Sequence, residues 1–264
     1  TPDHLNRHHT MECYTETKAR VAMNQTKEQM CVLNYEDERL QQVAKNMSAD
    51  VFWFSSAREL ERGIFLRGEE IVCRDGEEIT LCNIHDLKLL GMHYYENVMA
   101  AAAIAHGMNV PWDVIRKVVC EFQAVPHRIE FVKEVNGVKY YNDSKGTNPD
   151  AAIKAVEAMV RPTIVIGGGY DKESVYDEWI ASFGTKVKSL VLLGQTADKI
   201  AEAAAKAGFT AVTKVDSLEE AVAECARQAQ DGDAVLLSPA CASWGMFKNF
   251  EERGDLFKEY VKKL

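Results

Sequence analysis

The residue types best suited to chemistry in this chain lie side by side in the stretch DSKGT, residues 143–147. They offer a cation, several hydrogen-bond donors and, through the glycine, close access to the backbone. The amine of Lys145 and the hydroxyls of Ser144 and Thr147 would suit an anion such as a phosphate or a carboxylate. Because polar turns use the same residue types, composition leaves both a turn and a ligand-binding loop open.

The residues around this stretch predict the elements that would position it. GVKYY, residues 137–141, has the pattern of a strand, while Asn148 suits a helix N-cap, Pro149 a first helical position and Asp150 a first turn. Residues 143–147 are therefore predicted to form a strand-to-helix loop, which in an open parallel sheet lies at the ligand-binding carboxyl edge. The loop is not a P-loop, since G-x-x-x-x-G-K-[S/T] occurs nowhere in the chain.

A second candidate is LLSPACASWGMFKNFEERGDLF, residues 236–257. A strand is predicted to end at Ser238-Pro239, small residues follow, and a helix is predicted to begin near Phe247. Small residues let a ligand approach the backbone, and Ser243 can offer both its hydroxyl and its N–H. The alternative is tight packing between the loop and the sheet.

A third candidate is VIGGGYDKES, residues 165–174, which places three glycines and Lys172 after a predicted strand. It fails as a dinucleotide fingerprint, because G-x-G-x-x-G would need a glycine where Lys172 stands. A glycine turn that lets Lys172 reach the same carboxyl edge is the better functional interpretation.

The N-terminal stretch TPDHLNRHHTMECYTETKARV contains His4 and His8 at helical spacing, together with Lys18. Two histidines at this spacing can bind zinc, but no third ligand stands at a recognisable distance. From the residues alone, Lys18 is a solvated helix lysine.

Charge and composition restrict the class of protein. The 264 residues carry a net charge of -9, whereas nucleic acids and anionic membranes need a basic face, so neither is expected as a partner. No apolar run approaches the roughly 18 residues of a membrane span.

The seven cysteines form no C-x-x-C pair, which predicts reduced, mostly buried thiols in the cytoplasm. Since Thr1 is not a start residue, we expect the chain to begin inside a longer protein.

The pattern of elements predicts an α/β protein with two parts. Residues 28–81 read as short strands, with a hairpin around Asp75-Gly76, and two helices follow from Tyr95. After Pro126, strands alternate with helices, which predicts parallel pairing in a doubly wound, Rossmann-like sheet. The predicted domains are residues 1–125 and 126–264.

Several motifs together resemble the Mur ligase family, and its D-glutamate-adding branch in particular. The matching stretches run from residue 1 almost to the end: TPDHLNRH, YTETKA, GMHYYENVMAAAA, VPHRIE, NDSKGTNP, GGGYDK and LSPACASWGMFKNFEERGDLF. The D-N-P-R motif of the branches that add diaminopimelate or lysine is absent.

The resemblance implies that residues 1–125 are part of a central ATP-binding domain and residues 126–264 a C-terminal amino-acid-binding domain. It also implies that the UDP-binding domain and the P-loop are missing, so we expect the isolated chain to be inactive.

The resemblance implies a cytoplasmic, monomeric enzyme of peptidoglycan synthesis. Its substrates would be UDP-N-acetylmuramoyl-L-alanine, D-glutamate and ATP, with Mg²⁺ as cofactor. ATP would phosphorylate the substrate carboxylate, and the amine of D-glutamate would attack the acyl phosphate. Both steps develop negative charge on clustered oxygens, which cations stabilise.

The same resemblance implies roles for individual residues. His4 would bind Mg²⁺, Lys18 would support it as a carbamate, and Lys145 would lie near the transferred phosphoryl group. The nucleotide would be held by Asn97, Arg128 and Asp143, and D-glutamate by Thr147, Lys172, Ser243 and Phe250. Two positions depart from the family pattern: Tyr94 replaces an asparagine, and Gly245 stands where relatives commonly carry aspartate.

Two other functions remain open at this point. One is a ligase for another amino acid, including a relative of folylpoly-γ-glutamate synthetase. The other is a non-catalytic module that binds a nucleotide or an amino acid, which the absence of a P-loop motif favours.

Overall fold

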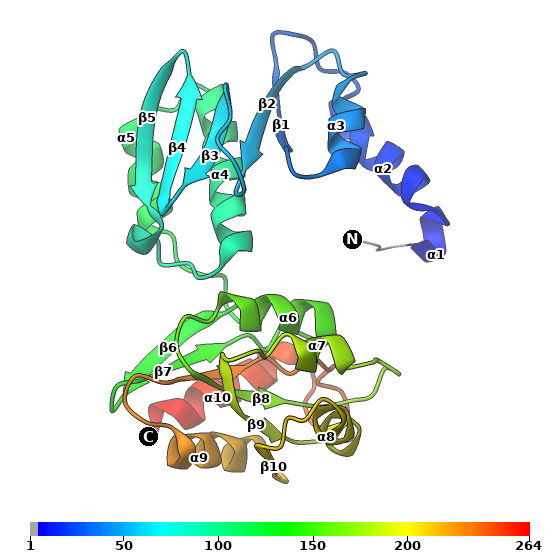
Figure 1. Cartoon of the computed structure of the whole chain (residues 1–264), viewed down its shortest axis with the longest axis vertical. Helices are drawn as coiled ribbons and strands as arrows, with labels where there is room; N and C mark the ends of the chain where they lie inside the picture. The colour runs from blue at the N-terminus through cyan, green and yellow to red at the C-terminus, as the bar shows by residue number, and fades with distance from the viewer. Residues whose placement is uncertain (1–4) are drawn as a thin grey trace. The chain divides into compact units, whose positions relative to one another are not determined.

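The computed structural model describes residues 5–264, which form two compact units with the boundary after Phe122. Unit 1 denotes the residues up to Phe122 and unit 2 the residues from Gln123 onward (Figure 1). The sequence placed the boundary close by, after Val125.

Unit 1 contains a mixed sheet with the strand order β1-β2-β3-β4-β5. The first three strands pair in parallel and the last three in antiparallel fashion. The strands are β1 (Met30–Asn34), β2 (Asp50–Ser55), β3 (Gly63–Arg67), β4 (Glu70–Asp75) and β5 (Glu77–Asn83). The helices are α1 (Leu5–His8), α2 (Met11–Ala19), η1 (Arg20–Ala22), α3 (Glu38–Ala44), η2 (Ile84–Asp86), α4 (Met92–Gly107) and α5 (Trp112–Glu121).

The hairpin predicted at Asp75-Gly76 is confirmed, because β4 and β5 pair on either side of Gly76. Gly76 has φ +76°, a conformation that glycine adopts without strain. The second of the two helices predicted after Tyr95 begins at Trp112, with Pro111 as its N-cap.

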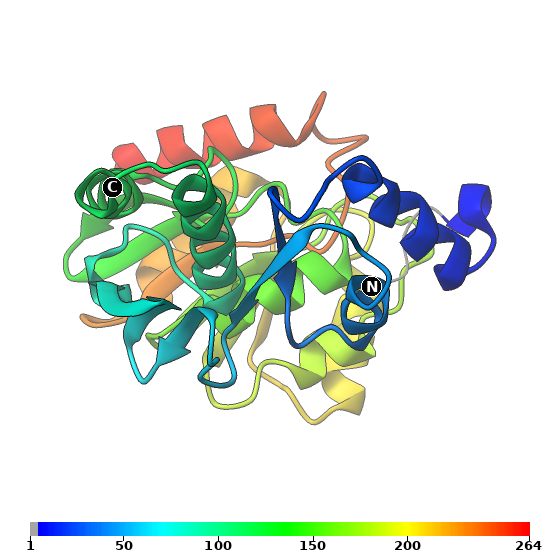
Figure 2. The same ribbon diagram turned by 90° about the horizontal axis from the view of Figure 1, so that it is seen from above.

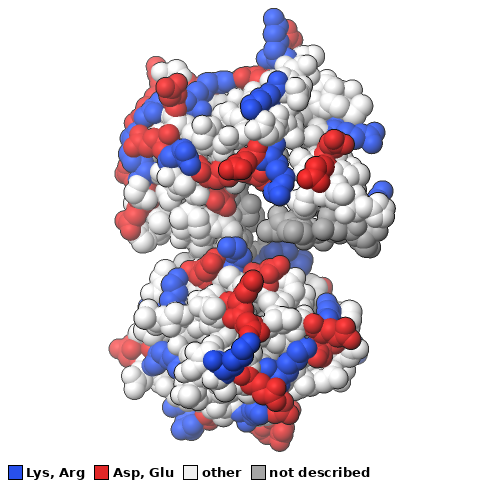
Figure 3. Space-filling view, turned by 45° about the vertical axis from the view of Figure 1, so that its right-hand side comes forward, with Lys and Arg blue, Asp and Glu red and all other residues white. Residues whose placement is uncertain are grey.

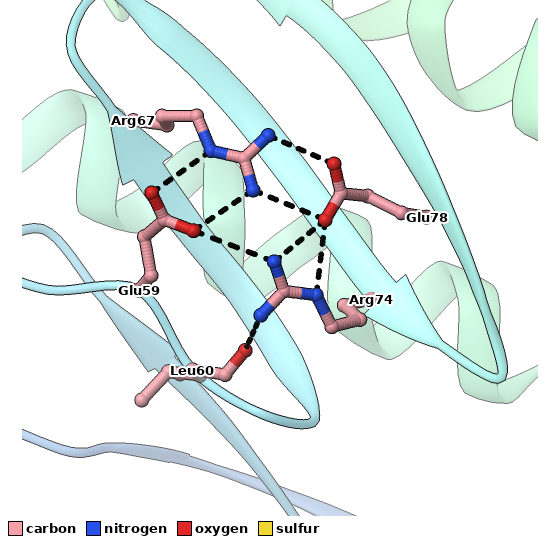
Figure 4. Close-up of polar contacts among 5 residues, drawn as sticks. All are labelled: Glu59, Leu60, Arg67, Arg74 and Glu78. Carbon is pink, nitrogen blue, oxygen red and sulfur yellow. Dashed lines mark hydrogen bonds and ion pairs between the residues drawn. The ribbon is translucent and has the colours of Figure 1, made fainter.

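An ion-pair network lies on one face of the β3-β4-β5 part of this sheet (Figure 4). Arg67 bridges Glu59 and Glu78, and Arg74 contacts the same two carboxylates and the carbonyl oxygen of Leu60. Hydrogen bonds from Arg67 and Arg74 lower the pKa of Glu78 to about 2. Since every charge has a partner of opposite sign, this network is a stabilised surface rather than a site that awaits a ligand.

Unit 2 is built on a six-stranded sheet with the order β10-β9-β8-β11-β7-β6. Its strands are β6 (Glu130–Val135), β7 (Val138–Asn142), β8 (Thr163–Gly167), β9 (Val187–Leu192), β10 (Val212–Lys214) and β11 (Ala234–Leu237). Its helices are α6 (Pro149–Ala158), α7 (Asp177–Ala181), α8 (Ala197–Lys206), α9 (Leu218–Gln228) and α10 (Phe250–Lys262), the last seen lengthwise in Figure 2.

The doubly wound sheet predicted for this part of the chain is confirmed. All neighbouring strands pair in parallel except β6, which runs antiparallel to β7 at one edge. The last strand, β11, lies between β7 and β8, so the crossover through α6 passes over it. Such a change of direction in the strand order creates the crevice in which ligands bind in open α/β sheets.

Helices cover both faces of the sheet of unit 2. One core cluster joins β-strand residues such as Val235 to Val222 of α9 and Phe257 of α10. On the other face, Trp179 of α7 is fully buried and lies so close to Gly167 that a side chain there would meet its ring at 2.7 Å.

The predicted N-cap of α6 is confirmed, because the Asn148 side chain accepts a hydrogen bond from the Ala151 N–H at 2.8 Å. The predicted start of the last helix at Phe247 is wrong. The helix begins at Phe250 with Asn249 as its cap, while the Phe247 N–H donates to the carbonyl of Ser243 in a preceding turn.

All seven cysteines are free thiols, and most are buried. Positive and negative side chains are interspersed on the face of the molecule in Figure 3. In the described range, none of the helices has the length and apolar character that crossing a bilayer requires.

Candidate active site of unit 2

Three loops of unit 2 follow strands that are direct neighbours. Residues 143–148 follow β7, residues 168–176 follow β8, and residues 238–249 follow β11, which pairs in parallel with both β7 and β8. The antiparallel pairing of Glu130 with Asn142 brings the residues before β6, including Arg128, to the same edge. The fold therefore collects the predicted residues of unit 2 at the carboxyl edge of the sheet.

Main-chain contacts join the loops after β8 and β11. The Gly168 N–H donates to the carbonyl of Pro239 at 2.9 Å, and the Tyr170 N–H donates to the carbonyl of Ala242 at 2.9 Å. Gly169 has φ +153°, and a side chain at this position would lie 2.4 Å from the Ala242 oxygen. Glycine is thus required here by the close approach of the two loops.

A buried arginine that the sequence reasoning missed joins the loops after β7 and β11. Arg253 of α10 is 2% exposed. Its Nε and Nη2 donate to the hydroxyl and carbonyl of Ser144 at 2.9 and 2.8 Å, and its Nη1 donates to the carbonyl of Cys241 at 3.2 Å. Burial lowers its pKa to about 10. Helical periodicity could have predicted the burial of Arg253, because it occupies the same helix face as the buried Phe257 and Val261.

Ser144 does not have the role that its residue type suggested. Its side chain is fully buried, and its hydroxyl donates to the carbonyl of Phe250 at 2.8 Å while it accepts from Arg253. The expectation that this hydroxyl meets an anion is therefore wrong, since both neighbours are protein groups.

Asp143 is also inside the protein, with 6% of its surface exposed. Its Oδ1 accepts a hydrogen bond from the Ile129 N–H at 3.3 Å, and its Oδ2 accepts one from the Ser238 hydroxyl at 2.8 Å. Burial raises its pKa to about 7, and the two hydrogen bonds oppose this rise. Asp143 thus connects the loops after β7 and β11 to the residues around Arg128.

The backbone around Arg128 is unusual. His127 and Ile129 have φ of +66° and +44°, and a β-branched residue seldom adopts this left-handed conformation. Such strain persists where the surrounding structure holds it, here through the bond from Ile129 to Asp143. The result is that Arg128 is exposed between two buried neighbours.

The buried side chains of Asn142 and His127 form a polar pair next to Arg128. The Asn142 side-chain amide donates to His127 Nδ1 at 3.0 Å and to Glu130 Oε2 at 3.0 Å. This contact requires the proton of a neutral His127 to be on Nε2, which lies 3.9 Å from a carboxylate oxygen of Asp255. A side chain at Gly254 would meet His127 Nδ1 at 2.2 Å, so α10 packs directly against the histidine.

The predicted lysines are exposed and lie over aromatic rings. Lys145 Nζ is 5.3 Å from the centre of the Phe250 ring, and Lys172 Nζ is 4.8 Å from that of Trp244. Ser243, next to Trp244, is 3% exposed. Both ammonium groups therefore lie beside the segment that follows β11.

Thr147 completes the predicted set of unit 2. It is half-buried in the loop after β7, and its N–H donates to the Lys145 carbonyl at 2.8 Å. Thr147 thus lies just before the N-cap of α6, two residues from the exposed Lys145.

The remaining predicted residues belong to unit 1. Asn97 is exposed on α4, and Tyr94, the departure from the family pattern, is buried on the same helix. Lys18 is exposed on α2 with its Nζ 5.6 Å from the Tyr14 ring, and it borders a cavity of about 460 Å³. His4 lies outside the described residues.

The metal site that the sequence predicts falls partly outside the described residues. Between residues 5 and 264, no group of three His, Cys, Asp or Glu side chains is arranged to hold a metal ion. The magnesium site expected at His4 and Lys18, and the zinc alternative with His8, both depend on His4.

Comparison with known proteins identifies the class. Residues 1–105 match the family described as Mur ligase middle domain, and residues 127–241 match the one described as Mur ligase, glutamate ligase domain. Together with the α/β fold and the strand-end loops, these matches show that the chain belongs to the Mur ligase family.

Curated relatives point to one branch of this family. The chain is 59% identical over 265 residues to a UDP-N-acetylmuramoylalanine–D-glutamate ligase of Lachnoclostridium phytofermentans and 56% identical to that of Lachnospira eligens. Each match covers 100% of this chain, but 58% and 59% of the relatives. The chain thus spans somewhat over half the length of these proteins.

Solved structures share the fold at low sequence identity. A UDP-N-acetylmuramate–alanine ligase from Thermotoga maritima matches with a TM-score of 0.70 at 15% identity, covering 99% of this chain and 58% of that one. A folylpolyglutamate synthase from Mycobacterium tuberculosis matches with a TM-score of 0.60 at 14% identity, covering 86% and 55%. These likenesses concern the fold alone.

Proposed function

We propose that this chain belongs to an ATP-dependent ligase that adds D-glutamate to UDP-N-acetylmuramoyl-L-alanine in peptidoglycan synthesis. Relatives at 59% and 56% identity bear this name. The observation that carries the proposal is the arrangement of Lys145, Lys172 and Ser243 on loops after three adjacent parallel strands, which Arg253 and main-chain bonds tie together. A dicarboxylic amino acid needs cations and N–H donors at one place, and this edge offers them.

The settings of the unit 2 residues support the roles that the family resemblance implies. Lys172 and Ser243 would bind the carboxylates of D-glutamate with Thr147, and Lys145 would face the phosphoryl group and the oxygens on which charge develops. Phe250 would contact D-glutamate and also support Lys145 through its ring. With both carboxylates of the amino acid held, its amine is left to attack the acyl phosphate.

The nucleotide would be bound mainly by exposed groups. Arg128 is exposed between two neighbours with left-handed backbone conformations, and its guanidinium suits a phosphate. Asp143 would reach the ribose only if its bonds inside the protein were exchanged, so we assign it chiefly to holding the loop of Arg128. On unit 1, Asn97 would contact adenine.

The remaining assignments rest on family likeness. Unit 1 would be part of the ATP-binding domain and unit 2 the amino-acid-binding domain. Mg²⁺ would be held by His4, with Lys18 as a carbamate; the cavity beside Lys18 gives a modified side chain room. We expect a monomer in the cytoplasm.

Calorimetric titration of the 264-residue chain with D-glutamate tests the proposal. We expect binding of D-glutamate in preference to L-glutamate and L-lysine. Substitution Lys172→Met should weaken it about ten-fold or more, since it removes a charge-assisted hydrogen bond. The matched control is Lys154→Met on α6, which removes an exposed lysine paired with Glu157.

Other outcomes would count against the proposal. Preference for L-glutamate or L-lysine would favour a ligase for another amino acid. Equal effects of the Lys172 and Lys154 substitutions would show that the carboxyl edge is not the binding site.

A further inference from the structure

Both lysines at the carboxyl edge lie over rings that come from one segment, residues 238–250. Phe250, the first residue of α10, lies under Lys145, and Trp244 lies under Lys172, at 5.3 and 4.8 Å from ring centre to Nζ. A lysine side chain has a flexible four-carbon stem and keeps many conformations when it is exposed. A ring at this distance attracts the ammonium group and restricts those conformations.

The indole of Trp244 is held in place although it is 54% exposed. Its ring lies 5.6 Å from that of Tyr170 at an interplanar angle of 59°, a favourable tilted contact. Tyr170 is itself fixed, because its N–H donates to the carbonyl of Ala242 at 2.9 Å. The residue before Trp244 is the buried Ser243. The indole is therefore anchored on both sides without being part of the core.

We propose that Trp244 is a positioning residue that holds the ammonium of Lys172 ready for a carboxylate of D-glutamate. This inference rests on the proposed function above. If the ring limits the conformations of Lys172 before the ligand arrives, less conformational freedom is lost on binding, and the affinity is higher. Trp244 acts on the ligand through Lys172 and need not touch it.

The proposal explains an exposed tryptophan that packing does not. The half-exposed indole has two aromatic or cationic partners, Lys172 and Tyr170. Gly245, which follows with φ +82°, lets the chain turn away directly after the indole. The same glycine was a departure from the family pattern, and here it has a structural reason.

Nuclear magnetic resonance tests the geometry without any ligand. The ε-methylene protons of Lys172 should resonate upfield, because the adjacent Nζ lies over the Trp244 ring. Substitution Trp244→Leu should abolish this shift, and Trp244→Phe should retain part of it. Unshifted Lys172 protons in the wild-type chain would overturn the inference.

Titration with D-glutamate tests the consequence. We expect Trp244→Leu to weaken binding about two- to five-fold, the size of an exposed cation–π contact, and Trp244→Phe to restore much of the loss. Once Lys172 is replaced by methionine, the Trp244→Leu change should have no further effect. The matched control is Tyr260→Leu on α10, which removes the ring that lies 5.4 Å from Nζ of Lys263, the C-cap residue of this helix.

The outcomes separate the two proposals. If the wild-type chain binds no D-glutamate, the proposed function fails and takes this inference with it. If the wild type binds and Trp244→Leu binds equally well, only the positioning role is refuted. A loss in Trp244→Leu that persists in the Lys172→Met background also refutes it, because the effect would then not pass through the lysine.

Discussion

Replacing Asp143 by asparagine would remove a carboxylate from the centre of the linked loops while nearly keeping its shape. The Asp143 oxygens accept hydrogen bonds from the Ile129 N–H and the Ser238 hydroxyl. An asparagine oxygen can keep the first bond, and its amide can donate to Ser238, because a hydroxyl both donates and accepts. The substitution therefore changes charge and proton binding much more than packing.

The size of the pH effect on the free energy of unfolding follows from the burial of this carboxyl group. Burial raises the pKa of Asp143 from its ordinary value of 3.8 to about 7. Between these two pH values, the folded protein holds a proton that the unfolded chain has released, so the free energy of unfolding falls as the pH rises. Each pKa unit corresponds to about 1.4 kcal/mol, so the loss through this window is on the order of 4 kcal/mol. The Asp143→Asn variant lacks this loss.

Urea unfolding over a range from about pH 4 to about pH 8 measures the effect. Hydrogen exchange of β7 and β11 would report on unit 2 specifically. The quantity of interest is the stability of Asp143→Asn minus that of the wild type, which removes contributions from all other titrating groups. We expect this difference to rise by about 4 kcal/mol across the range. The control Asp216→Asn, at an exposed position, should show no comparable rise.

Two results would refute this reasoning. A difference that is independent of pH would mean that the Asp143 carboxyl group does not hold a proton in the folded protein at these pH values. A difference that falls with rising pH would mean that nearby cations, such as Arg128 and Arg253, stabilise the charged form more than burial disfavours it.

Three further predictions concern the supports of the site and the surface of unit 1. Arg253→Lys should lower the free energy of unfolding by about 3 kcal/mol, because an ammonium group cannot make the three bonds of the guanidinium fork; thermal denaturation that matches the wild type would contradict this. Gly254→Ala should cost about 1–3 kcal/mol by pushing α10 away from His127, and a structure with unchanged His127 would argue against it. In unit 1, Arg67→Met should raise the pKa of Glu78 from its lowered value toward the ordinary one; a carboxyl titration by nuclear magnetic resonance that does not move would show that Arg74 suffices.

Local signals predicted much of the architecture correctly. Alternation of strands and helices after Pro126 gave the doubly wound sheet, and the Asn148-Pro149 pair gave the start of α6, since caps depend on only a few neighbouring residues. The three-residue strand β10 and the five-residue helix α7 were missed. Elements this short carry too few residues for a periodic pattern.

The candidate site was predictable as a set of loops but not as a set of contacts. Lys145, Lys172 and Ser243 were predicted to share one edge because they lie in strand-end loops of a parallel sheet. The roles of Ser144 and Arg253 were not found, because a hydroxyl and a guanidinium look the same in sequence whether they face a ligand or the protein interior. Only burial distinguishes them, and burial depends on partners more than 100 residues away in the chain, since the Ser144–Arg253 contact spans 109 residues.

The sequence by itself determined the fold class, the loops that carry the cations and the family, because these depend on periodicity, caps and motifs that are local in the chain. Only the tertiary structure decided that β11 is inserted between β7 and β8, that Arg253 ties the loops together, and that Trp244 lies under Lys172. The physical reason is that packing brings together groups whose separation in sequence is arbitrary, and the environment of each group, more than its type, sets its charge, its freedom and its partners.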